Sequence, residues 1–115
     1  DREKGLTGWV DGVGTPERMA GICLDQMWLA HAGIHFLFTA DLDMLERSQG
    51  TRGYRYAMMN AGRLGQRIYL AATALGLGCC GIGAFYDREA AEFLGLRGSC
   101  RLLYLVAVGR VKRAE

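Results

Sequence analysis

The stretch from Gly50 to Gly83 carries the strongest helix signal in the chain, followed directly by a glycine stop. Its apolar residues recur at helical spacing and predict one apolar stripe over about five to six turns. The residues of this stripe are Ala57, Ala61, Leu64, Ile68, Ala71, Ala72 and Leu75. Gly76 and Gly78 follow, and glycine is the residue that a helix C-terminus prefers. The stretch therefore predicts one long amphipathic helix.

Two glycines, Gly62 and Gly65, lie inside this predicted helix, where each costs roughly 1 kcal/mol relative to alanine. Together with Ala61 they form a surface of small residues. Such a surface indicates close approach by another backbone or by a flat ligand. The arginines that fall mostly off the apolar stripe, and suit a wetter face, are Arg55, Arg63 and Arg67.

The run Cys79–Phe85 (CCGIGAF) is short and too apolar for a surface loop. It predicts a buried strand or extended segment whose glycines let another group come close to the main chain. The vicinal pair Cys79 and Cys80 allows a soft-metal site or a strained disulfide, but small apolar residues in a buried segment are the more ordinary interpretation.

These segments resemble a known family. AGRLGQRIYLAATALGLGCCGIGAFYD, together with RLLYLVAVG near the end, resembles the C-terminal half of the nitroreductase-like FMN flavoproteins. It is most similar to the SagB-type dehydrogenase branch, in which a glycine-containing helix runs into an ALGLG turn and a GIGAF-like segment. The resemblance covers residues 24–110 loosely and residues 54–87 well. It implies an α+β fold, with a small sheet covered by helices and one long central helix.

The resemblance also implies a cofactor site. The cofactor-binding residues would be Gly81, Ile82, Gly83, Ala84, Arg110, Lys112 and Arg113. The amides of Gly83 and Ala84 would face the FMN isoalloxazine near N5 and O4, and the three basic residues would hold its phosphate. A solvated charged tail is an equally good interpretation of the basic residues. NAD(P)H would be the co-substrate and an organic molecule the acceptor, in a dimer whose FMN site lies between subunits.

One motif departs from the SagB-type pattern. That branch often reads Lys-Tyr-Gly-x-Arg-x-Tyr-Arg, and its Lys-Tyr pair is implicated in azoline oxidation. Here Gly50, Arg52, Tyr54 and Arg55 match, but Ser48 and Gln49 occupy the Lys-Tyr positions. Neither replaces a lysine or a phenol as a general acid or base, so this particular oxidation is not expected.

The rest of the chain predicts a helix over residues 15–32 with Thr15 as N-cap and Pro16 in its first turn. A strand over residues 34–40 is apolar on both faces and is expected at the centre of its sheet. Shorter helices over 42–47 and 88–94, capped by Asp41 and Asp87, and a buried strand over 101–108 complete the pattern. His31 and His35 are four apart, but Gly33 lies between them and no metal site is expected.

Length and composition limit the classes of function. The chain has 115 residues, half of them hydrophobic and one of them proline, which predicts a single domain, 1–115, with a loop-like start over 1–14. A formal net charge of +2 does not favour nucleic acid or a membrane surface. No apolar run approaches the roughly 18 residues of a membrane helix, and nothing resembles a signal peptide. The spacing of the four cysteines fits neither a zinc motif nor CxxC, so we expect reduced thiols and a cytoplasmic location.

Two functions follow from these observations. The first is an FMN-dependent oxidoreductase that transfers hydride between NAD(P)H and an organic acceptor, with the chemistry carried by the flavin. The second is a truncated, non-catalytic module that dimerises or joins a larger assembly. The second is favoured by the short chain and by the lack, in residues 1–14, of the arginine-rich segment that the family's N-terminal half brings.

Overall fold

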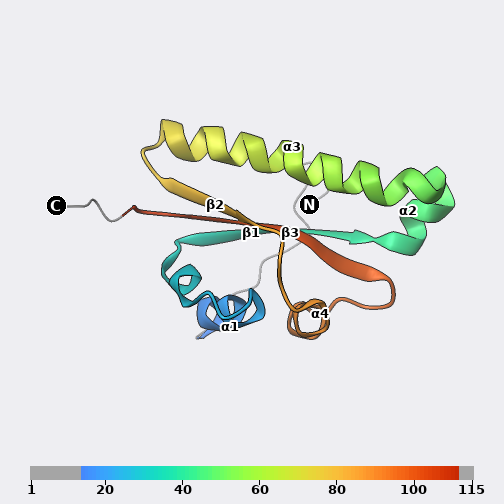
Figure 1. Ribbon diagram of the computed structural model, residues 1–115, viewed down its shortest axis with the longest axis horizontal. Coiled ribbons are helices and arrows are strands. Elements are labelled where there is room, and N and C mark those ends of the chain that lie inside the picture. Colours follow the sequence, from blue (N-terminus) through green and yellow to red (C-terminus); the bar gives the residue numbers. More distant parts are fainter. Residues whose placement is uncertain (1–13, 112–115) are drawn as a thin grey trace.

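The computed structural model describes residues 14–111. Its elements are α1 (Thr15–Ile22), the 3-10 helix η1 (Met27–His31), β1 (Ile34–Asp41), α2 (Leu42–Gln49), the 3-10 helix η2 (Gly50–Arg52), α3 (Gly53–Ala74), β2 (Gly78–Ile82), α4 (Asp87–Leu94) and β3 (Cys100–Gly109). The strands form a three-stranded antiparallel sheet in the order β1-β3-β2. Helix α3 lies along one face of this sheet, and α1 and α4 lie on the other (Figure 1). The predicted α+β architecture with one long helix is confirmed.

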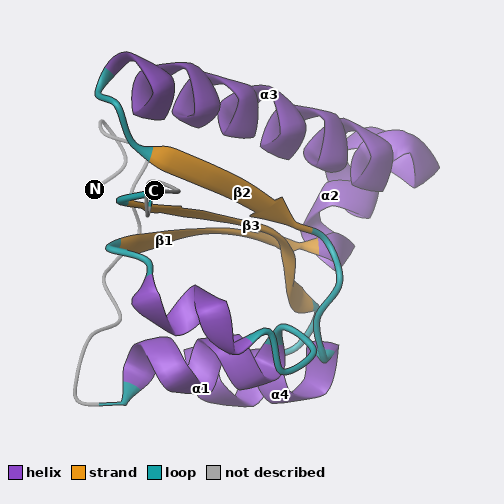
Figure 2. Cartoon of the chain, turned by 60° about the vertical axis from the view of Figure 1, so that its left-hand side comes forward, coloured by secondary structure: helices purple, strands orange, loops and turns teal. Residues whose placement is uncertain are grey.

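The strand β3 is the centre of the sheet, and it separates two hydrophobic clusters. Leu105 and Ala107 belong to the cluster on the α1 and α4 side, whereas Val106 and Val108 belong to the cluster on the α3 side. Successive side chains of a strand point to opposite faces, so a strand with helices on both sides must be apolar throughout. Figure 2 shows the resulting three layers.

The prediction that residues 34–40 form the central strand was wrong. β1 is an edge strand of the described sheet and pairs only with β3, from Ile34 opposite Val108 to Asp41 opposite Cys100. Its both-sided apolar pattern arises from helices on both faces of the sheet rather than from a strand on each side. The apolar pattern indicates that both faces of the strand are covered. It carries no information about whether the strand lies at an edge of the sheet.

The predicted helix over residues 15–32 is interrupted. α1 ends at Ile22, Leu24 and Asp25 adopt positive φ angles of 60° and 58°, and the chain resumes as η1. The turn lets Leu29, which is fully buried, join the same cluster as Ile22 and Cys23. Gly14, not Thr15, occupies the N-cap.

The ends of the other helices follow local chemistry. Asp41 caps α2 as predicted: its Oδ1 accepts a hydrogen bond from the Met44 amide at 3.2 Å and another from the Ser99 hydroxyl. These bonds, the one from Ser99 first, hold the pKa of Asp41 below its usual value. Tyr86, rather than Asp87, is the N-cap of α4.

The C-terminus of α3 closes in a Schellman motif. Gly76 has a φ of 73°, the Leu77 amide donates to the Ala72 carbonyl at 2.8 Å, and the Gly76 amide donates to the Thr73 carbonyl at 3.1 Å. The left-handed residue is glycine, as the sequence predicts. The chain is thereby turned back from α3 into β2.

The two glycines inside α3 differ in what surrounds them. A Cβ at Gly65 would lie 2.8 Å from Cε2 of Tyr104 on β3, so this glycine admits the Tyr104 ring between helix and sheet. A Cβ at Gly62 would meet nothing within 4 Å. The predicted close approach therefore holds at Gly65, where an aromatic side chain makes it.

This difference predicts opposite effects of the same substitution. Gly65→Ala should destabilise the fold by about 1–3 kcal/mol, because the methyl group forces the Tyr104 ring to move and this exceeds the gain in helix propensity. Gly62→Ala, the matched control, should stabilise it by up to about 1 kcal/mol. Urea unfolding followed by circular dichroism measures both. Equal stability of the two variants would contradict the described packing of Tyr104.

Candidate functional site

The segment that follows β2 exposes main chain that a ligand can reach. Gly83 and Ala84 are exposed, and a Cβ added to Gly83 would meet nothing within 4 Å. None of the turn and loop hydrogen bonds of the described residues uses their amides. The segment thus offers two adjacent amides that the turn and loop hydrogen bonds leave unused, and open space where a side chain of residue 83 would lie.

Both ends of this segment are fixed to the body of the protein. Before it, Ile82 is 6% exposed and belongs to the core cluster on the α1 and α4 side. After it, Phe85 packs against the same cluster, and the Tyr86 amide donates to the Ile22 carbonyl of α1 at 2.8 Å. The short exposed stretch is therefore held between β2 and α1.

Gly81 has a different environment from Gly83. Its amide donates to the Tyr69 hydroxyl of α3 at 2.6 Å, and a Cβ on it would overlap the Tyr104 hydroxyl. Burial first, then the neighbouring Tyr69 hydroxyl, raises the pKa of Tyr104 above its usual value. Among the four residues expected along this main chain, Gly81 and Ile82 thus contact the protein interior, while Gly83 and Ala84 are exposed.

Only one of the three basic residues expected at a phosphate lies within the described residues. Arg110 directly follows β3 and is exposed, and Lys112 and Arg113 lie outside the described residues. Gly109 pairs with Gly78, so Arg110 lies beside the beginning of β2 and Gly83 lies just beyond its end. The separation along the strand is roughly 16 Å at ~3.3 Å per residue. A single ligand that reached both places would have to be elongated and follow β2.

The vicinal cysteines do not act as a pair. Cys79 packs into the α3-side cluster and Cys80 packs against the opposite cluster, as expected for neighbours in a strand. All four cysteines are free thiols. Burial is the main cause that raises the pKa of Cys79 and of Cys23, which disfavours their thiolates. The alternatives of a strained disulfide or a shared soft metal do not fit this geometry.

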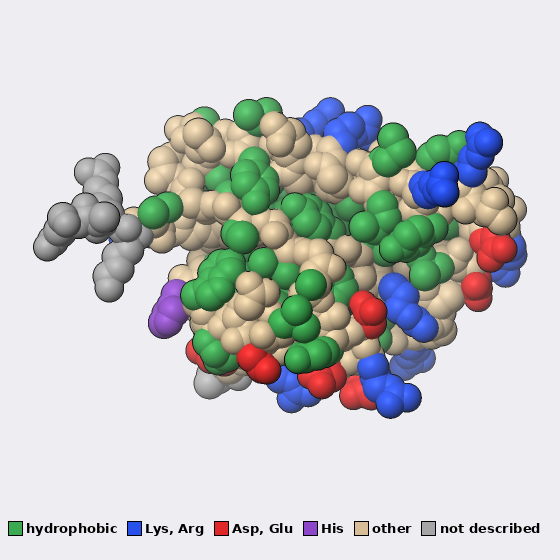
Figure 3. Space-filling model, in the orientation of Figure 1, with side chains coloured by type: hydrophobic (Ala, Val, Ile, Leu, Met, Phe, Trp, Pro, Cys, Tyr) green, Lys and Arg blue, Asp and Glu red, His purple; other side chains and the backbone are tan. Residues whose placement is uncertain are grey.

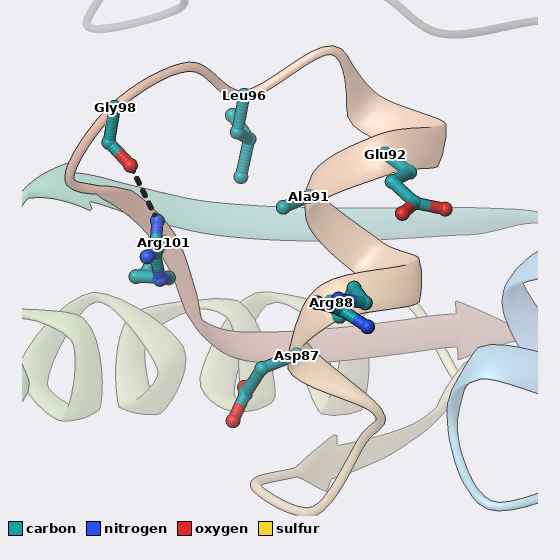
Figure 4. Close-up of a pocket in the computed structure, with 7 residues that line it drawn as sticks. All are labelled: Asp87, Arg88, Ala91, Glu92, Leu96, Gly98 and Arg101. Carbon is teal, nitrogen blue, oxygen red and sulfur yellow. Dashed lines mark hydrogen bonds between the residues drawn. The ribbon is translucent and has the colours of Figure 1, made fainter.

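The described surface hollows lie away from Gly83 and Ala84. One, of about 420 Å³, lies between α4 and the loop before β3 and is shown in Figure 4. Its lining residues are Asp87, Arg88, Ala91, Glu92, Leu96, Gly98 and Arg101. Charges of both signs line it, and its Arg101 guanidinium donates to the Gly98 carbonyl at 2.8 Å. A second, on α2, is lined by Asp43, Glu46 and Arg47.

The histidines do not form a ligand pair. The Nε2 atom of His35 lies 2.9 Å from the Leu29 carbonyl, and His31 is the last residue of η1. Among residues 14–111, no three His, Cys, Asp or Glu side chains gather in a way that would hold a metal ion. None of the helices within these residues combines the length and the hydropathy that a membrane-spanning segment requires.

Two side chains near the candidate segment were not predicted from the sequence, namely Tyr69 and Tyr104. Tyr104 fills the space between Gly65 and Gly81, and Tyr69 accepts the Gly81 amide. The small residues gave a signal that something approaches closely. They gave no information about which group does so.

The fold defines the class of protein. Residues 14–110 match the family model "Nitroreductase family". A crystal structure of a candidate nitroreductase from Anabaena variabilis superposes with a TM-score of 0.77 at 38% identity, over 82% of this chain and 19% of that one. The NADPH:FMN oxidoreductase of Vibrio harveyi superposes with a TM-score of 0.76 over 90% of this chain and 49% of that one; at 20% identity it shows the fold alone.

A candidate nitroreductase of Methanocaldococcus jannaschii is 41% identical over 92 residues, which are 80% of this chain and 46% of that protein. The chain belongs to the nitroreductase family, an oxidoreductase family. It spans about half the length of the curated relative that it matches.

Proposed function

We propose that this chain is the flavin-presenting half of an FMN-dependent oxidoreductase, which transfers hydride between NAD(P)H and an organic acceptor. The observation that carries the proposal is the exposed Gly83–Ala84 main chain, open to solvent yet fixed at both ends, in a chain of the nitroreductase family. Bound FMN would supply the hydride chemistry. An NADPH:FMN oxidoreductase among the solved structures with this fold supports the choice of cofactor.

The chain's own residues would bind and orient rather than react. The Gly83 and Ala84 amides would donate to the electron-rich edge of the flavin ring, and such fixed donors act without reorganising during the reaction. The absence of a side chain at Gly83 would let the ring approach the main chain. Arg110, Lys112 and Arg113 remain the proposed phosphate ligands, and Arg110 lies beside the beginning of β2.

Ser48 and Gln49 bear on which acceptor the enzyme would reduce, because they occupy the positions of the Lys-Tyr pair of the SagB-type pattern. Both lie at the end of α2, where neither supplies a lysine amine or a phenol. We therefore propose hydride transfer to a small organic acceptor without azoline oxidation, although the segment order resembles the SagB-type branch. We also propose a cytoplasmic location, since all four cysteines are free thiols.

The remainder of the flavin site would come from a partner. Gly83 and Ala84 are exposed, so further walls would be needed to enclose a ligand there. We propose a second copy of this chain, or a partner subunit, as the source of those walls.

The apolar stripe of α3 supports this partner. Its residues at positions 57, 61, 64, 68, 71 and 75 follow the alternating four- and three-residue spacing of a helix–helix seam. The sheet buries Ala61 to 4% exposure, but Leu64 is 41% exposed and Leu75 is 74% exposed. The stripe is therefore wider than the surface that the described residues cover. Figure 3 shows hydrophobic side chains exposed below α3, with Arg side chains along its outer side.

The proposed function is tested by adding FMN to the purified chain, removing free flavin by gel filtration and recording the visible spectrum. The parent chain should retain flavin. Gly83→Val should lose it, because two methyl groups would fill the approach to the main chain, while circular dichroism stays unchanged. Gly83→Ala, the smaller step, should bind more weakly than the parent. Equal flavin occupancy in the valine variant would show that the site is wrongly placed.

A colourless parent chain that keeps its fold would instead support the alternative, a non-catalytic nitroreductase-like module that acts in dimerisation or as a subunit. The observation that favours this alternative is the exposure of Gly83 and Ala84, which the described residues leave uncovered.

The partner surface gives a separate prediction. Leu64→Glu should shift the chain from dimer to monomer in sedimentation experiments, because a carboxylate would be desolvated within the helix seam. Leu70→Glu is the matched control: Leu70 is 62% exposed on the same helix but lies off the seam. If both variants sediment like the parent, the seam is not the contact surface.

A further inference from the structure

The hydrogen bond from the Gly81 amide to the Tyr69 hydroxyl joins α3 to the strand that leads into the candidate site. The two residues are twelve apart in sequence, and the nitrogen and oxygen atoms are 2.6 Å apart. This contact crosses from one layer of the fold to the next, since Tyr69 belongs to α3 and Gly81 to β2.

The position of Gly81 in the sheet explains why the bond matters. β2 is an edge strand of the described sheet, and Gly81 lies opposite Val106 of β3. Alternate residues of an antiparallel edge strand direct their main-chain groups away from the neighbouring strand, where they need another partner. Helix α3 runs beside this edge (Figure 2), and Tyr69 provides the acceptor.

The Tyr69 side chain is itself restrained by packing. It is partly buried against the α3-side cluster, together with Tyr104 and Val106. The Tyr104 ring occupies the space that Gly65 and Gly81 leave open, and it stacks on Phe38 with ring centroids 6.1 Å apart. The acceptor oxygen is therefore presented from a packed site rather than from a free surface side chain.

The segment that Tyr69 holds is conformationally permissive. Gly81 and Gly83 flank Ile82, and glycine has more backbone conformations to lose on ordering than any other residue. A fixed Gly81 amide reduces the range over which the following main chain can turn. The directions of the Gly83 and Ala84 amides depend on that turn.

We propose that Tyr69 is a positioning residue: through its hydroxyl it fixes β2 at Gly81 and thereby aims the Gly83 and Ala84 amides at the flavin. This inference rests on the proposed function for its ligand. It assigns to α3 a role in flavin geometry that is separate from the role of its exposed stripe in partner contact.

The first test needs no flavin. In Tyr69→Phe, hydrogen exchange of the Gly81 amide, measured by NMR on the full chain, should become about 3- to 10-fold faster, the range expected for loss of one ordinary hydrogen bond. Exchange at Val106 in the central strand should stay as in the parent. Tyr56→Phe, which removes a hydroxyl from an exposed tyrosine of the same helix, is the control and should leave Gly81 unchanged. If the exchange rate of the Gly81 amide is unchanged in Tyr69→Phe, the Tyr69 hydroxyl does not fix β2 at Gly81 and the proposal is wrong.

The second test uses FMN. Tyr69→Phe should raise the FMN dissociation constant about 3- to 10-fold and shift the absorption maximum of the bound flavin. A loss of stability alone would lower occupancy but leave the spectrum of the bound fraction unchanged. If the parent binds FMN and the variant gives the same affinity and spectrum, the positioning role is wrong. If the parent does not bind FMN, the proposed function is wrong, and so is the proposal that Tyr69 positions the Gly83 and Ala84 amides toward flavin.

Discussion

The Tyr104 ring between Gly65 and Gly81 sets the distance between α3 and β2, and it determines how the long helix packs on the sheet. The ring belongs to the central strand and stacks on Phe38 of the opposite edge strand, so all three strands and the long helix meet around one side chain. Packed interiors tolerate little change in volume, and a methyl group at either glycine would displace this ring. The same close spacing lets Tyr69 reach the Gly81 amide.

Local signals in the sequence predicted most of the elements. The helix stop at Gly76, the Asp41 cap and the strand before α2 are each determined by a few neighbouring residues, and the structure confirms them. Residues 79–85 were expected to be buried throughout, but β2 ends at Ile82, and Gly83 and Ala84 are exposed. Contacts between distant segments were not predictable in this way. The small residues of α3 indicated close approach, but its partner is a tyrosine 39 positions beyond Gly65, which no local pattern identifies.

The errors have a common physical origin. The apolar pattern of residues 34–40 reports that helices cover both faces of the sheet, and it was interpreted as evidence for a central position. Similarly, the apolar positions of residues 15–32 fit one helix, but Leu24 and Asp25 turn the chain so that both halves face one cluster. Apolar patterns in the sequence indicate which side of a segment is covered. They do not indicate where a helix is interrupted or which strands pair with a given strand.

The proposed site also explains why the sequence shows no set of catalytic side chains. When main-chain amides hold a cofactor that carries the chemistry, the residues that matter are those that leave space and those that fix the backbone. Gly83 leaves space beside an exposed amide, whereas Gly81 leaves space for Tyr104 and gives its own amide to Tyr69. Gly81 and Gly83 are two residues apart but differ in their surroundings, and only the three-dimensional structure distinguishes the glycine that faces open space from the one that faces the protein.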